Sequence, residues 1–324
     1  MINKQNISDT KIFSHLDRIL GDKRPITADI FLNNYCNNLC PYCTYRRWDF
    51  EDGARYMSFE NFVKYATRLK ELGAIGFILT GGGEPTISKD FMKIADWLSE
   101  NHYHWGINTN FNEMRKIKPD YLKVSLDGWD SNSYIEKRGV DSYLRVCDNI
   151  QEYAEWKRAN SPSTSLGIQL VTKSVSEVLM FYKKNKDLPV DYISFRPVES
   201  TRSQYYKTLS DDFDTNPDEI IRAIKNIASL DERVIINYKW DFLTHSESSC
   251  TAQWAQIALD ETGNVIYCCH KPYQIVGHIM DDDILEKKEK AFTDMSMCDV
   301  PCRMTAPNFH VSKLMKKNKD VGFI

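Results

Sequence analysis

The feature that most constrains the fold is an alternation of short apolar stretches with amphipathic segments through the middle of the chain. Residues 75–80 and 166–172 are short and apolar, whereas residues 58–72 place apolar side chains at helical spacing. Strands that alternate with helices favour a parallel sheet covered by helices. With a first strand at 27–33 we count about six such units, fewer than the eight of a closed barrel. The sequence therefore predicts an α/β fold built on a partial (β/α)6 barrel of the TIM type.

The alternation ends before the C-terminal quarter of the chain. Residues 256–268 resemble two short strands around a turn at Gly263, which predicts a β-hairpin. The cysteines that surround it indicate a small cysteine-rich α+β domain. We divide the chain into an N-terminal extension (1–28), the barrel (29–200), a connector (201–247) and a C-terminal cysteine-rich domain with its tail (248–324).

Charge and hydropathy exclude several classes of partner. The formal net charge is −3, which gives no strong attraction to nucleic acid or to an anionic membrane. No apolar run approaches the ~20 residues of a membrane-spanning helix, and the first residues lack the apolar stretch of a signal peptide. We therefore expect a cytoplasmic protein without nucleic-acid or membrane partners. In that reducing compartment, clustered cysteines indicate metal binding or catalysis rather than disulfides.

Three of the nine cysteines lie in the stretch CNNLCPYC, at Cys36, Cys40 and Cys43. A structural zinc site takes four ligands, and a [4Fe–4S] cluster is normally held by four thiolates. Three thiolates would leave one iron open for a small molecule. The alternative is a zinc site that a distant residue completes.

The spacing C-x3-C-x2-C, with Tyr42 before the last cysteine, resembles the signature of the radical S-adenosylmethionine (SAM) enzymes. GGGEP at 81–85 and the order of strands and helices extend the resemblance over about residues 29–200. Both motifs follow strands, so both fall on the edge of the sheet where such folds carry their chemistry. The resemblance implies a [4Fe–4S] cluster that binds SAM, reductive cleavage of SAM and hydrogen abstraction by a 5′-deoxyadenosyl radical.

The family pattern also implies SAM contacts. Gly82, Gly83 and Glu84 match the loop that meets the methionine amino group, where glycine permits close approach and a carboxylate pairs with an ammonium. Asn108, Ser125 and Asp127 lie at strand ends, where their polar side chains can reach the ribose of SAM. The alternative is that these side chains only stabilise ordinary turns. Arg138 matches a contact to the SAM carboxylate, and the alternative is an ordinary surface arginine. Tyr42 matches a contact to the adenine, and the alternative is a packing role. The predicted SAM-binding residues are Tyr42, Gly82, Gly83, Glu84, Asn108, Ser125, Asp127, Arg138 and Arg196.

A second group of cysteines resembles the small auxiliary-cluster domains, called SPASM or twitch, of many radical SAM enzymes. Cys250 and Cys268 flank the hairpin glycine, and Cys298 and Cys302 resemble the closing pair. The resemblance implies one auxiliary [4Fe–4S] cluster on these four thiolates, which favours the twitch form. Cys269 could replace Cys268 as a ligand, and a four-cysteine zinc site is the alternative to iron.

The sequence constrains the substrate weakly. By elimination we expect a small-molecule biosynthetic substrate, such as an amino sugar or nucleotide sugar, in an oxidoreductase-like reaction that the auxiliary cluster could assist. The chain ends in DVGFI rather than a double glycine, so we do not expect conversion of GTP to a molybdenum-cofactor precursor. The main alternative is a maturase that epimerises, crosslinks or oxidises a ribosomally made peptide. No catalytic acid or base is assigned.

Two further expectations concern partners and class. Radical SAM chemistry needs an electron donor such as flavodoxin or ferredoxin, which the resemblance implies for this chain. A zinc-binding structural or adaptor protein on a barrel scaffold is the alternative from a different class. Iron–sulfur protein is coloured and zinc protein is colourless, so absorption distinguishes the two.

Overall fold

The computed structural model describes residues 14–43, 45, 53–199, 213–243, 249–291, 298 and 301–315. Its strands form one sheet of ten, in the order β10-β9-β8-β1-β2-β3-β4-β5-β6-β7. The run from β8 through β1 to β7 is parallel, and β9 and β10 add to it antiparallel. The strands are β1 (Thr27–Phe31), β2 (Gly76–Thr80), β3 (His104–Thr109), β4 (Tyr121–Ser125), β5 (Ser165–Thr172), β6 (Tyr192–Pro197), β7 (Val234–Ile236), β8 (Gln256–Leu259), β9 (Asn264–Ile266) and β10 (Ile275–His278).

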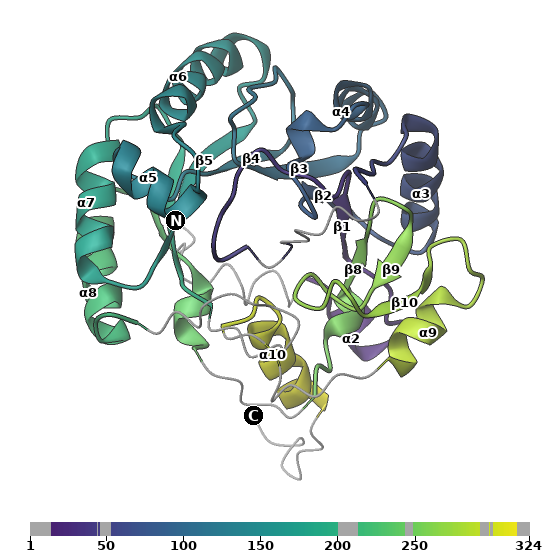
Figure 1. Cartoon of the computed structure of the whole chain (residues 1–324). Helices are drawn as coiled ribbons and strands as arrows, with labels where there is room; N and C mark the ends of the chain where they lie inside the picture. The colour runs from purple at the N-terminus through teal and green to yellow at the C-terminus, as the bar shows by residue number, and fades with distance from the viewer. Residues whose placement is uncertain are drawn as a thin grey trace.

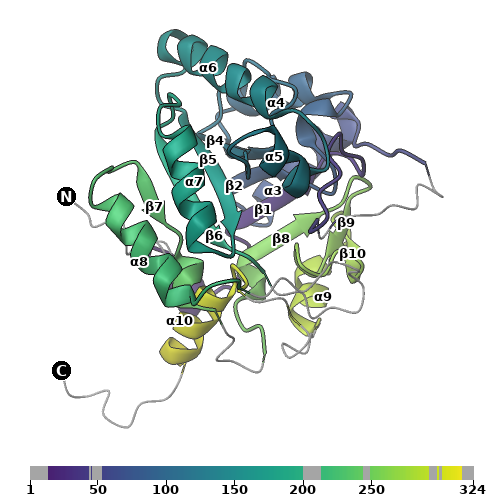
Figure 2. The same ribbon diagram turned by 60° about the vertical axis from the view of Figure 1, so that its left-hand side comes forward.

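The parallel strands curve into a ring with helices on its outer side (Figure 1). The described strands do not close the ring, because β7 and β10 remain its two edges. Turned by 60°, the molecule shows α7 and α8 side by side near β6 and β7 (Figure 2). The helices are α2 (Leu16–Leu20), α3 (Phe59–Glu71), α4 (Phe91–Glu100), α5 (Ser131–Arg138), α6 (Tyr143–Asn160), α7 (Val175–Asn185), α8 (Pro217–Ala228), α9 (Ile284–Lys290) and α10 (Thr305–Met315), and the short 3-10 turns are η3 (Pro85–Ile87), η4 (Tyr238–Asp241) and η5 (Gln253–Ala255). Among the described residues, no helix has the length and apolar character needed to cross a membrane.

Capping residues set where the helices of the barrel begin. Ser58 accepts a hydrogen bond from the Asn61 backbone at 3.2 Å and so starts α3. At α5, the side chains of Asp130 and Ser133 each bond the other's backbone, which forms a capping box. The same helix ends at Gly139, whose φ of 72° is the left-handed conformation that favours glycine. These two caps fix the position of Arg138, the last residue of α5.

The two faces of the barrel wall differ in chemistry. Successive strand residues point to opposite faces, and one face packs against the outer helices in the main core. Ile30, Leu79 and Val124 belong to this outer, apolar face. The other face lines the interior of the ring, which we call the lumen. Polar side chains gather there, and its members include Asp29, Asn108, Lys123, Ser125, Gln169 and Arg196.

Two tyrosines occupy the lumen toward the start of the strands, each against a glycine on the preceding strand. A Cβ atom at Gly106 would lie 2.0 Å from the ring of Tyr121, and one at Gly167 would lie 2.1 Å from the ring of Tyr192. Any larger residue would therefore displace these rings. The tyrosines form a floor, and the polar positions lie above it toward the carboxyl ends of the strands.

The predicted α/β fold with an open parallel sheet is confirmed, but the sheet is longer than predicted. β7 falls in the predicted connector and pairs with β6. β8, the first strand of the predicted hairpin, lies parallel to β1 in the same sheet. The hairpin therefore continues the barrel wall rather than forming a sheet of its own. Its partner β1 lies more than 200 residues earlier (Thr27 opposite Gln256), so local pattern could not reveal this pairing. The domain limits remain a prediction.

Candidate active site

The first cysteine group lies on the loop after β1, at the carboxyl edge of the sheet. Cys36 is exposed, Cys40 is buried and Cys43 is half-buried. The Cys36 sulfur accepts from the Asn38 backbone at 3.4 Å and from the Asn110 side chain at 3.7 Å. Burial and Glu84 raise the pKa of Cys36 to about 12, and the bond from the Asn38 backbone opposes that rise in favour of the thiolate, the form that binds metal. The loop therefore presents sulfur ligands that are oriented by neighbouring strand ends.

The donor chemistry of this loop fits an iron–sulfur cluster. In the described part of the chain, no three His, Cys, Asp or Glu side chains converge as ligands for a single ion would. A [4Fe–4S] cluster is held by a thiolate on each of several irons, so its ligands need not meet at one point. Cys36, Cys40 and Cys43 would hold such a cluster and leave one iron without a protein ligand from this loop.

The glycine-rich loop after β2 packs directly on the cysteine loop. A Cβ atom at Gly83 would lie 1.8 Å from the Tyr35 carbonyl oxygen, so only glycine fits there. The Glu84 backbone donates to the same Tyr35 carbonyl at 2.9 Å. Asn33 returns a bond from its side chain to the Glu84 carbonyl at 2.8 Å. A Cβ at Gly82 would be 3.0 Å from the Asn33 oxygen, a tight but milder contact. The two motifs thus form one structural unit.

The Glu84 carboxylate is largely engaged by the protein. One oxygen accepts from the Thr86 backbone and hydroxyl at 3.1 and 2.7 Å and from the Thr109 hydroxyl at 2.6 Å. Among the described residues, the other oxygen accepts a hydrogen bond only from the Asn110 backbone, at 2.7 Å. Burial raises the pKa of Glu84 above its usual value, while these hydrogen bonds oppose the rise. The second oxygen keeps a lone pair, so the predicted contact with a SAM ammonium remains a prediction.

Asparagines that the sequence reasoning missed connect the third strand to the cysteine loop. The Asn110 side chain donates to Asn37 at 2.6 Å, and the Asn112 side chain donates to Asn38 at 2.6 Å. The sequence pairs NN at 37–38 with NFN at 110–112, yet nothing in one chain connects residues more than 70 positions apart. These bonds hold the backbone between Cys36 and Cys40.

A buried cluster of Arg138, Asp127 and Tyr42 supports the second cysteine of the loop. Arg138 pairs with Asp127 at 2.6 Å and donates to the Cys40 sulfur at 3.3 Å. It also donates to the Ser125 carbonyl. The Tyr42 hydroxyl donates to Asp127 at 3.0 Å, and burial raises its pKa well above the usual value, so it stays protonated. The Asp127 carboxylate also accepts a hydrogen bond from the Val171 backbone at 2.6 Å. The backbone of Asp127 itself is in the left-handed conformation, with φ of 48°.

These partners give Arg138, Asp127 and Tyr42 a positioning role beside Cys40. The sequence predicted contacts with the SAM carboxylate, ribose and adenine instead, and these stay predictions. The Nε atom of Arg138 is buried without a hydrogen-bond partner in the described part of the chain. Nε and the second hydrogen of Nη1 are the guanidinium donors that these contacts leave available to a bound carboxylate.

The remaining predicted SAM contacts lie on the lumen face. The Asn108 side chain donates to the Thr80 hydroxyl at 3.3 Å, and its oxygen is buried without a partner among the described residues. Ser125 is half-buried at the end of β4. Arg196 pairs with Glu199 at 2.5 Å. The structure therefore places all three around the same interior space, and their contacts with SAM stay predictions.

The second cysteine group comes together from distant parts of the chain. Cys250 and Cys302 both pack against a small core around Trp254 and Met304. The Asn308 side chain on α10 donates to the Cys250 sulfur at 3.4 Å and accepts from the Ala252 backbone at 2.7 Å. Burial, with a smaller effect of Cys302 and Cys298, raises the pKa of Cys250 to about 12.

Cys268 and its neighbour Cys269 face different surroundings. Burial raises the pKa of Cys268, and Cys269 and Cys302 add to the rise. Cys269 instead lies near Arg303 and His270, which outweigh the effect of burial and lower its pKa to about 7. Cys268 therefore lies near Cys302, whereas Cys269 is dominated by the nearby basic residues Arg303 and His270. This separates two residues that the sequence could not distinguish.

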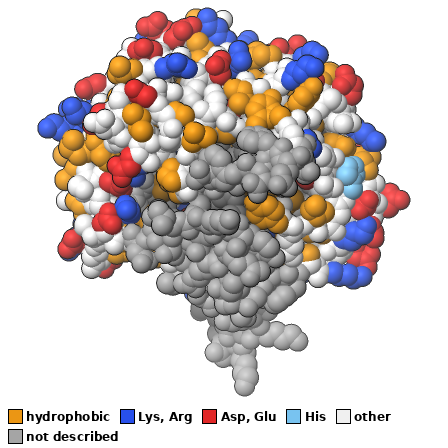
Figure 3. Space-filling view, viewed as in Figure 1, with side chains coloured by type: hydrophobic (Ala, Val, Ile, Leu, Met, Phe, Trp, Pro, Cys, Tyr) orange, Lys and Arg blue, Asp and Glu red, His pale blue; other side chains and the backbone are white. Residues whose placement is uncertain are grey.

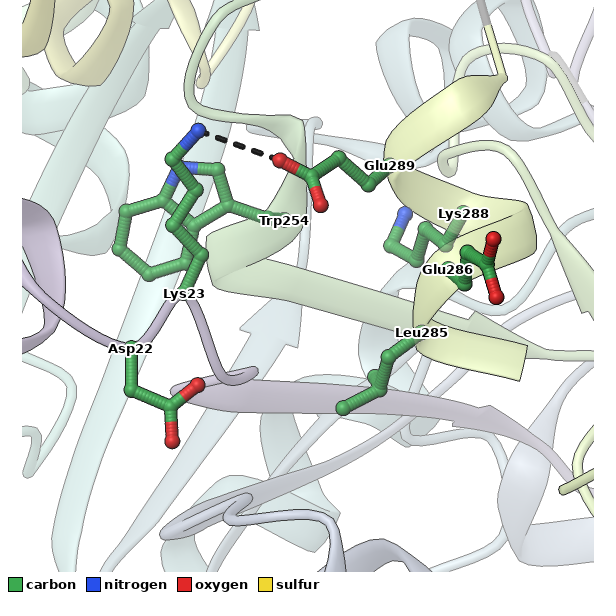
Figure 4. A pocket seen from close by; sticks show the side chains of 7 residues that line it. All are labelled: Asp22, Lys23, Trp254, Leu285, Glu286, Lys288 and Glu289. Atoms are coloured by element: carbon green, nitrogen blue, oxygen red, sulfur yellow. Dashed lines mark hydrogen bonds and ion pairs between the residues drawn. The ribbon is translucent and has the colours of Figure 1, made fainter. Parts of the chain in front are cut away.

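Two other surface features lie away from these groups. A pocket between the α2–β1 connection, η5 and α9 holds an exposed Lys23–Glu289 ion pair of 3.3 Å (Figure 4). It is lined by Asp22, Lys23, Trp254, Leu285, Glu286, Lys288 and Glu289. On the face seen in Figure 3, acidic and basic side chains alternate around the rim. Neither feature brings reactive groups together.

Comparison with known proteins identifies the barrel. Residues 30–187 match the model of the radical SAM superfamily, whose members are enzymes that use a [4Fe–4S] cluster and SAM. The sequence is 29% identical over 158 residues to an Fe-coproporphyrin III synthase from Methanosarcina barkeri, which covers 44% of this chain and 38% of that protein. It is 34% identical over 137 residues to a probable GTP 3′,8-cyclase from Pyrococcus horikoshii, which covers 40% of this chain and 43% of that protein. The match thus spans less than half of either relative.

The fold resembles a solved structure across almost the whole chain. SuiB of Streptococcus suis bound to its precursor peptide SuiA aligns with a TM-score of 0.64 and 14% identity, over 95% of this chain and 77% of that one. SuiB bound to SAM aligns with a TM-score of 0.61 and 14% identity, over 87% of this chain and 67% of that one. At this identity the likeness shows the fold alone.

Proposed function

Because the chain carries a radical SAM domain at residues 30–187, we propose that it is an enzyme that cleaves SAM reductively and abstracts hydrogen from a substrate. When bound, the cluster and SAM supply the electron and the 5′-deoxyadenosyl radical for that chemistry. One observation carries the proposal. The cysteine loop and the glycine loop form a single unit at the carboxyl edge of the strands, through Gly83, Tyr35 and Glu84.

The residues of this unit have distinct tasks. Cys36, Cys40 and Cys43 would hold the cluster. Asn110 and Arg138 donate to the sulfurs of Cys36 and Cys40, which orients the ligands and stabilises their charge. Gly82 and Gly83 leave backbone groups accessible to a small ligand. The lone pair left on Glu84 supports its assignment to the SAM ammonium.

We propose an auxiliary [4Fe–4S] cluster on Cys250, Cys268, Cys298 and Cys302, as in a twitch domain. Cys302 influences the pKa of both Cys250 and Cys268, and Cys250, Cys268 and Cys298 all raise the pKa of Tyr267, which supports their proximity. Cys269 is set apart by its contact with His270 and by the influence of Arg303. An auxiliary cluster here would lie beside the lumen, where it could take part in oxidation of a substrate.

The substrate of first choice is a small biosynthetic molecule that enters the lumen. A ribosomally made peptide is the second candidate, because the SuiB structure that aligns over 95% of this chain contains a precursor peptide. We further propose reduction by a flavodoxin or ferredoxin and a cytoplasmic site of action, without nucleic-acid or membrane partners.

Release of 5′-deoxyadenosine tests the proposal. Anaerobically reconstituted protein, given dithionite and SAM, should release 5′-deoxyadenosine, and a Cys40→Ala variant should not. The matched control is Cys147→Ala, because Cys147 packs partly buried against the main core, away from the cluster loop. Release that persists in Cys40→Ala would refute the assigned ligand set. Colourless protein that carries zinc would support the structural or adaptor alternative.

A further inference from the structure

The lumen holds a cluster of charged side chains, of which only Arg196 is also a predicted SAM contact. Its members come from strands and loops far apart in the sequence. We call this set the lumen charge cluster: Asp29, Lys123, Arg196, Glu199, Lys239 and Arg303. Four of these side chains are basic and two are acidic. The cluster therefore carries an excess of positive charge inside the barrel.

The two carboxylates are already shared among the basic groups. Asp29 pairs with Arg303 and also accepts from the Gln256 side chain at 2.5 Å. Glu199 pairs with Arg196 at 2.5 Å and with Lys239. His270 lies 3.8 Å from Glu199, which adds a further basic group at this carboxylate. Burial raises the pKa of Asp29, and the pairing with Arg303 opposes that rise.

Lys123 is the basic residue of the cluster that has no carboxylate partner in these pairs. Within the described residues it forms neither a hydrogen bond nor an ion pair. Burial lowers its pKa, and Arg196, Lys239 and Arg303 lower it further against the weaker opposing effect of Asp29, to about 7. A lysine buried among three other cations either loses its proton or is stabilised as an ammonium by an anion that completes the site.

Accessibility differs within the cluster, and Lys239, whose side chain is 7% exposed, is covered like the acids. The side chains of Arg196 and Arg303 are 28% and 26% exposed, and Lys123 is half-buried. The side chains of Asp29 and Glu199 are only 1% and 8% exposed. The groups that reach open space in the lumen are thus cationic, and the carboxylates are covered.

The cluster adjoins the candidate SAM site. Lys123 precedes Ser125 by two residues on β4, so both face the lumen, and Tyr121 forms the floor below. Arg196 lies within electrostatic reach of Asp127, which belongs to the Arg138–Cys40 cluster. A molecule held at Lys123 would therefore lie between the tyrosine floor and the carboxyl edge of the strands, where the substrate of the proposed reaction must lie.

We propose that Lys123, with Arg196 and Arg303, binds an anionic group of the substrate, either a phosphate or a carboxylate. The inference rests on the proposed function, because it names the class of substrate for the same lumen. Lysine and arginine bind phosphate and carboxylate groups through charge-assisted hydrogen bonds, which are stronger than those between neutral groups. The tested protein must be loaded with SAM, because SAM carries a carboxylate of its own.

Equilibrium dialysis of the anaerobically reconstituted, SAM-loaded protein tests the proposal, with inorganic phosphate and acetate as separate probes. We expect saturable binding of at least one probe, and the preferred probe tells whether the substrate group is a phosphate or a carboxylate. Lys123→Met should weaken this binding by about thirtyfold, the loss expected when one partner of a buried charge pair is removed. The matched control is Lys118→Met, an exposed lysine on the connection that leads into β4, which should bind as wild type does.

A second variant should change anion binding in the opposite direction, which simple loss of structure would not do. Asp29→Asn removes a negative charge from the lumen and should tighten binding of the same probe. A role of Asp29 in folding alone would weaken binding or leave it unchanged. If Lys123→Met loses iron or unfolds, Asp29→Asn and the conservative Lys123→Arg, which should retain binding, decide the question.

Three results would overturn the inference. They are no saturable binding of either anion to wild type, equal binding by Lys123→Met, and an equal loss of SAM affinity in Lys123→Met, which would assign the cluster to SAM. The proposed function is judged separately, by 5′-deoxyadenosine release without substrate. Anion binding without SAM cleavage would refute that function and keep the anion site. SAM cleavage without anion binding would do the reverse.

Discussion

The two cysteine groups of this protein reach their positions by different means. Cys36, Cys40 and Cys43 lie within eight residues on one loop, and the ends of neighbouring strands hold that loop through Asn110 and Arg138. The second group spans residues 250–302, and a small core with α10 brings its members together. The first group thus depends on the strand ends of the barrel, whereas the second depends on the small core and α10. The two should respond to different mutations.

The largest effect is expected where the first group depends on a buried charge. Arg138→Met leaves Asp127 buried without its partner, which should cost about 3–5 kcal/mol of the free energy of unfolding. It also removes the donor to Cys40. Urea denaturation of the reconstituted protein measures the loss. Arg138→Lys keeps the charge and should recover part of it, and a loss below about 1 kcal/mol in Arg138→Met would show that the cluster is not the support described here.

The next effect comes from the contact between the two motif loops. Gly83→Ala places a Cβ atom 1.8 Å from the Tyr35 carbonyl, so the loops must separate, at a cost of about 1–3 kcal/mol. We expect less iron bound by the first group and less 5′-deoxyadenosine released. Gly76→Ala is the matched control, because a Cβ atom there meets nothing within 4 Å. Equal behaviour of the two variants would contradict the close packing of the motifs.

A smaller effect is expected in the second region alone. Asn308→Ala removes the donor to Cys250 and the acceptor for the Ala252 backbone, which should cost about 1–2 kcal/mol. Iron should be lost from the auxiliary group while 5′-deoxyadenosine release without substrate continues. Iron lost equally from both groups would show that the two regions are coupled, against the comparison drawn above.

The smallest effect is expected from the N-terminal cap of α5, which helps to position Arg138 at the other end of the helix. Asp130→Ala removes the capping box of α5, the helix that ends at Arg138, and should cost about 1 kcal/mol. Thermal unfolding of the holoenzyme measures it, with the exposed Asn132→Ala in the same helix as control. A larger change in Asn132→Ala than in Asp130→Ala would argue against the cap as a support.

The difference between the regions also explains what could be predicted from the sequence. The first group was visible because its cysteines, the glycine loop and the strand–helix alternation are local patterns. The pairing of β8 with β1 and the bonds of Asn110 and Asn112 join residues far apart in the chain, so no local pattern encodes them. For the same reason Cys268 and Cys269 were equivalent in the sequence and differ only in the folded chain.

The sequence contains one weak indication of the lumen charge cluster. Asp29 and Lys123 are charged residues inside apolar strands, which in a parallel sheet covered by helices indicates the inner face. Their partners, among them Arg303, lie beyond the strands in sequence and could not be assigned. Single polar residues on apolar strands of a partial barrel therefore mark the lumen, and their grouping requires the structure.

The central claim is that this chain holds two iron–sulfur clusters, one on each cysteine group. Iron and sulfide counts after anaerobic reconstitution test it most directly, in wild type and in a Cys36/Cys40/Cys43→Ala triple variant. The account predicts about eight irons in wild type and about four in the variant. About four irons falling to none would remove the auxiliary cluster, and no iron in either protein would contradict the account as a whole.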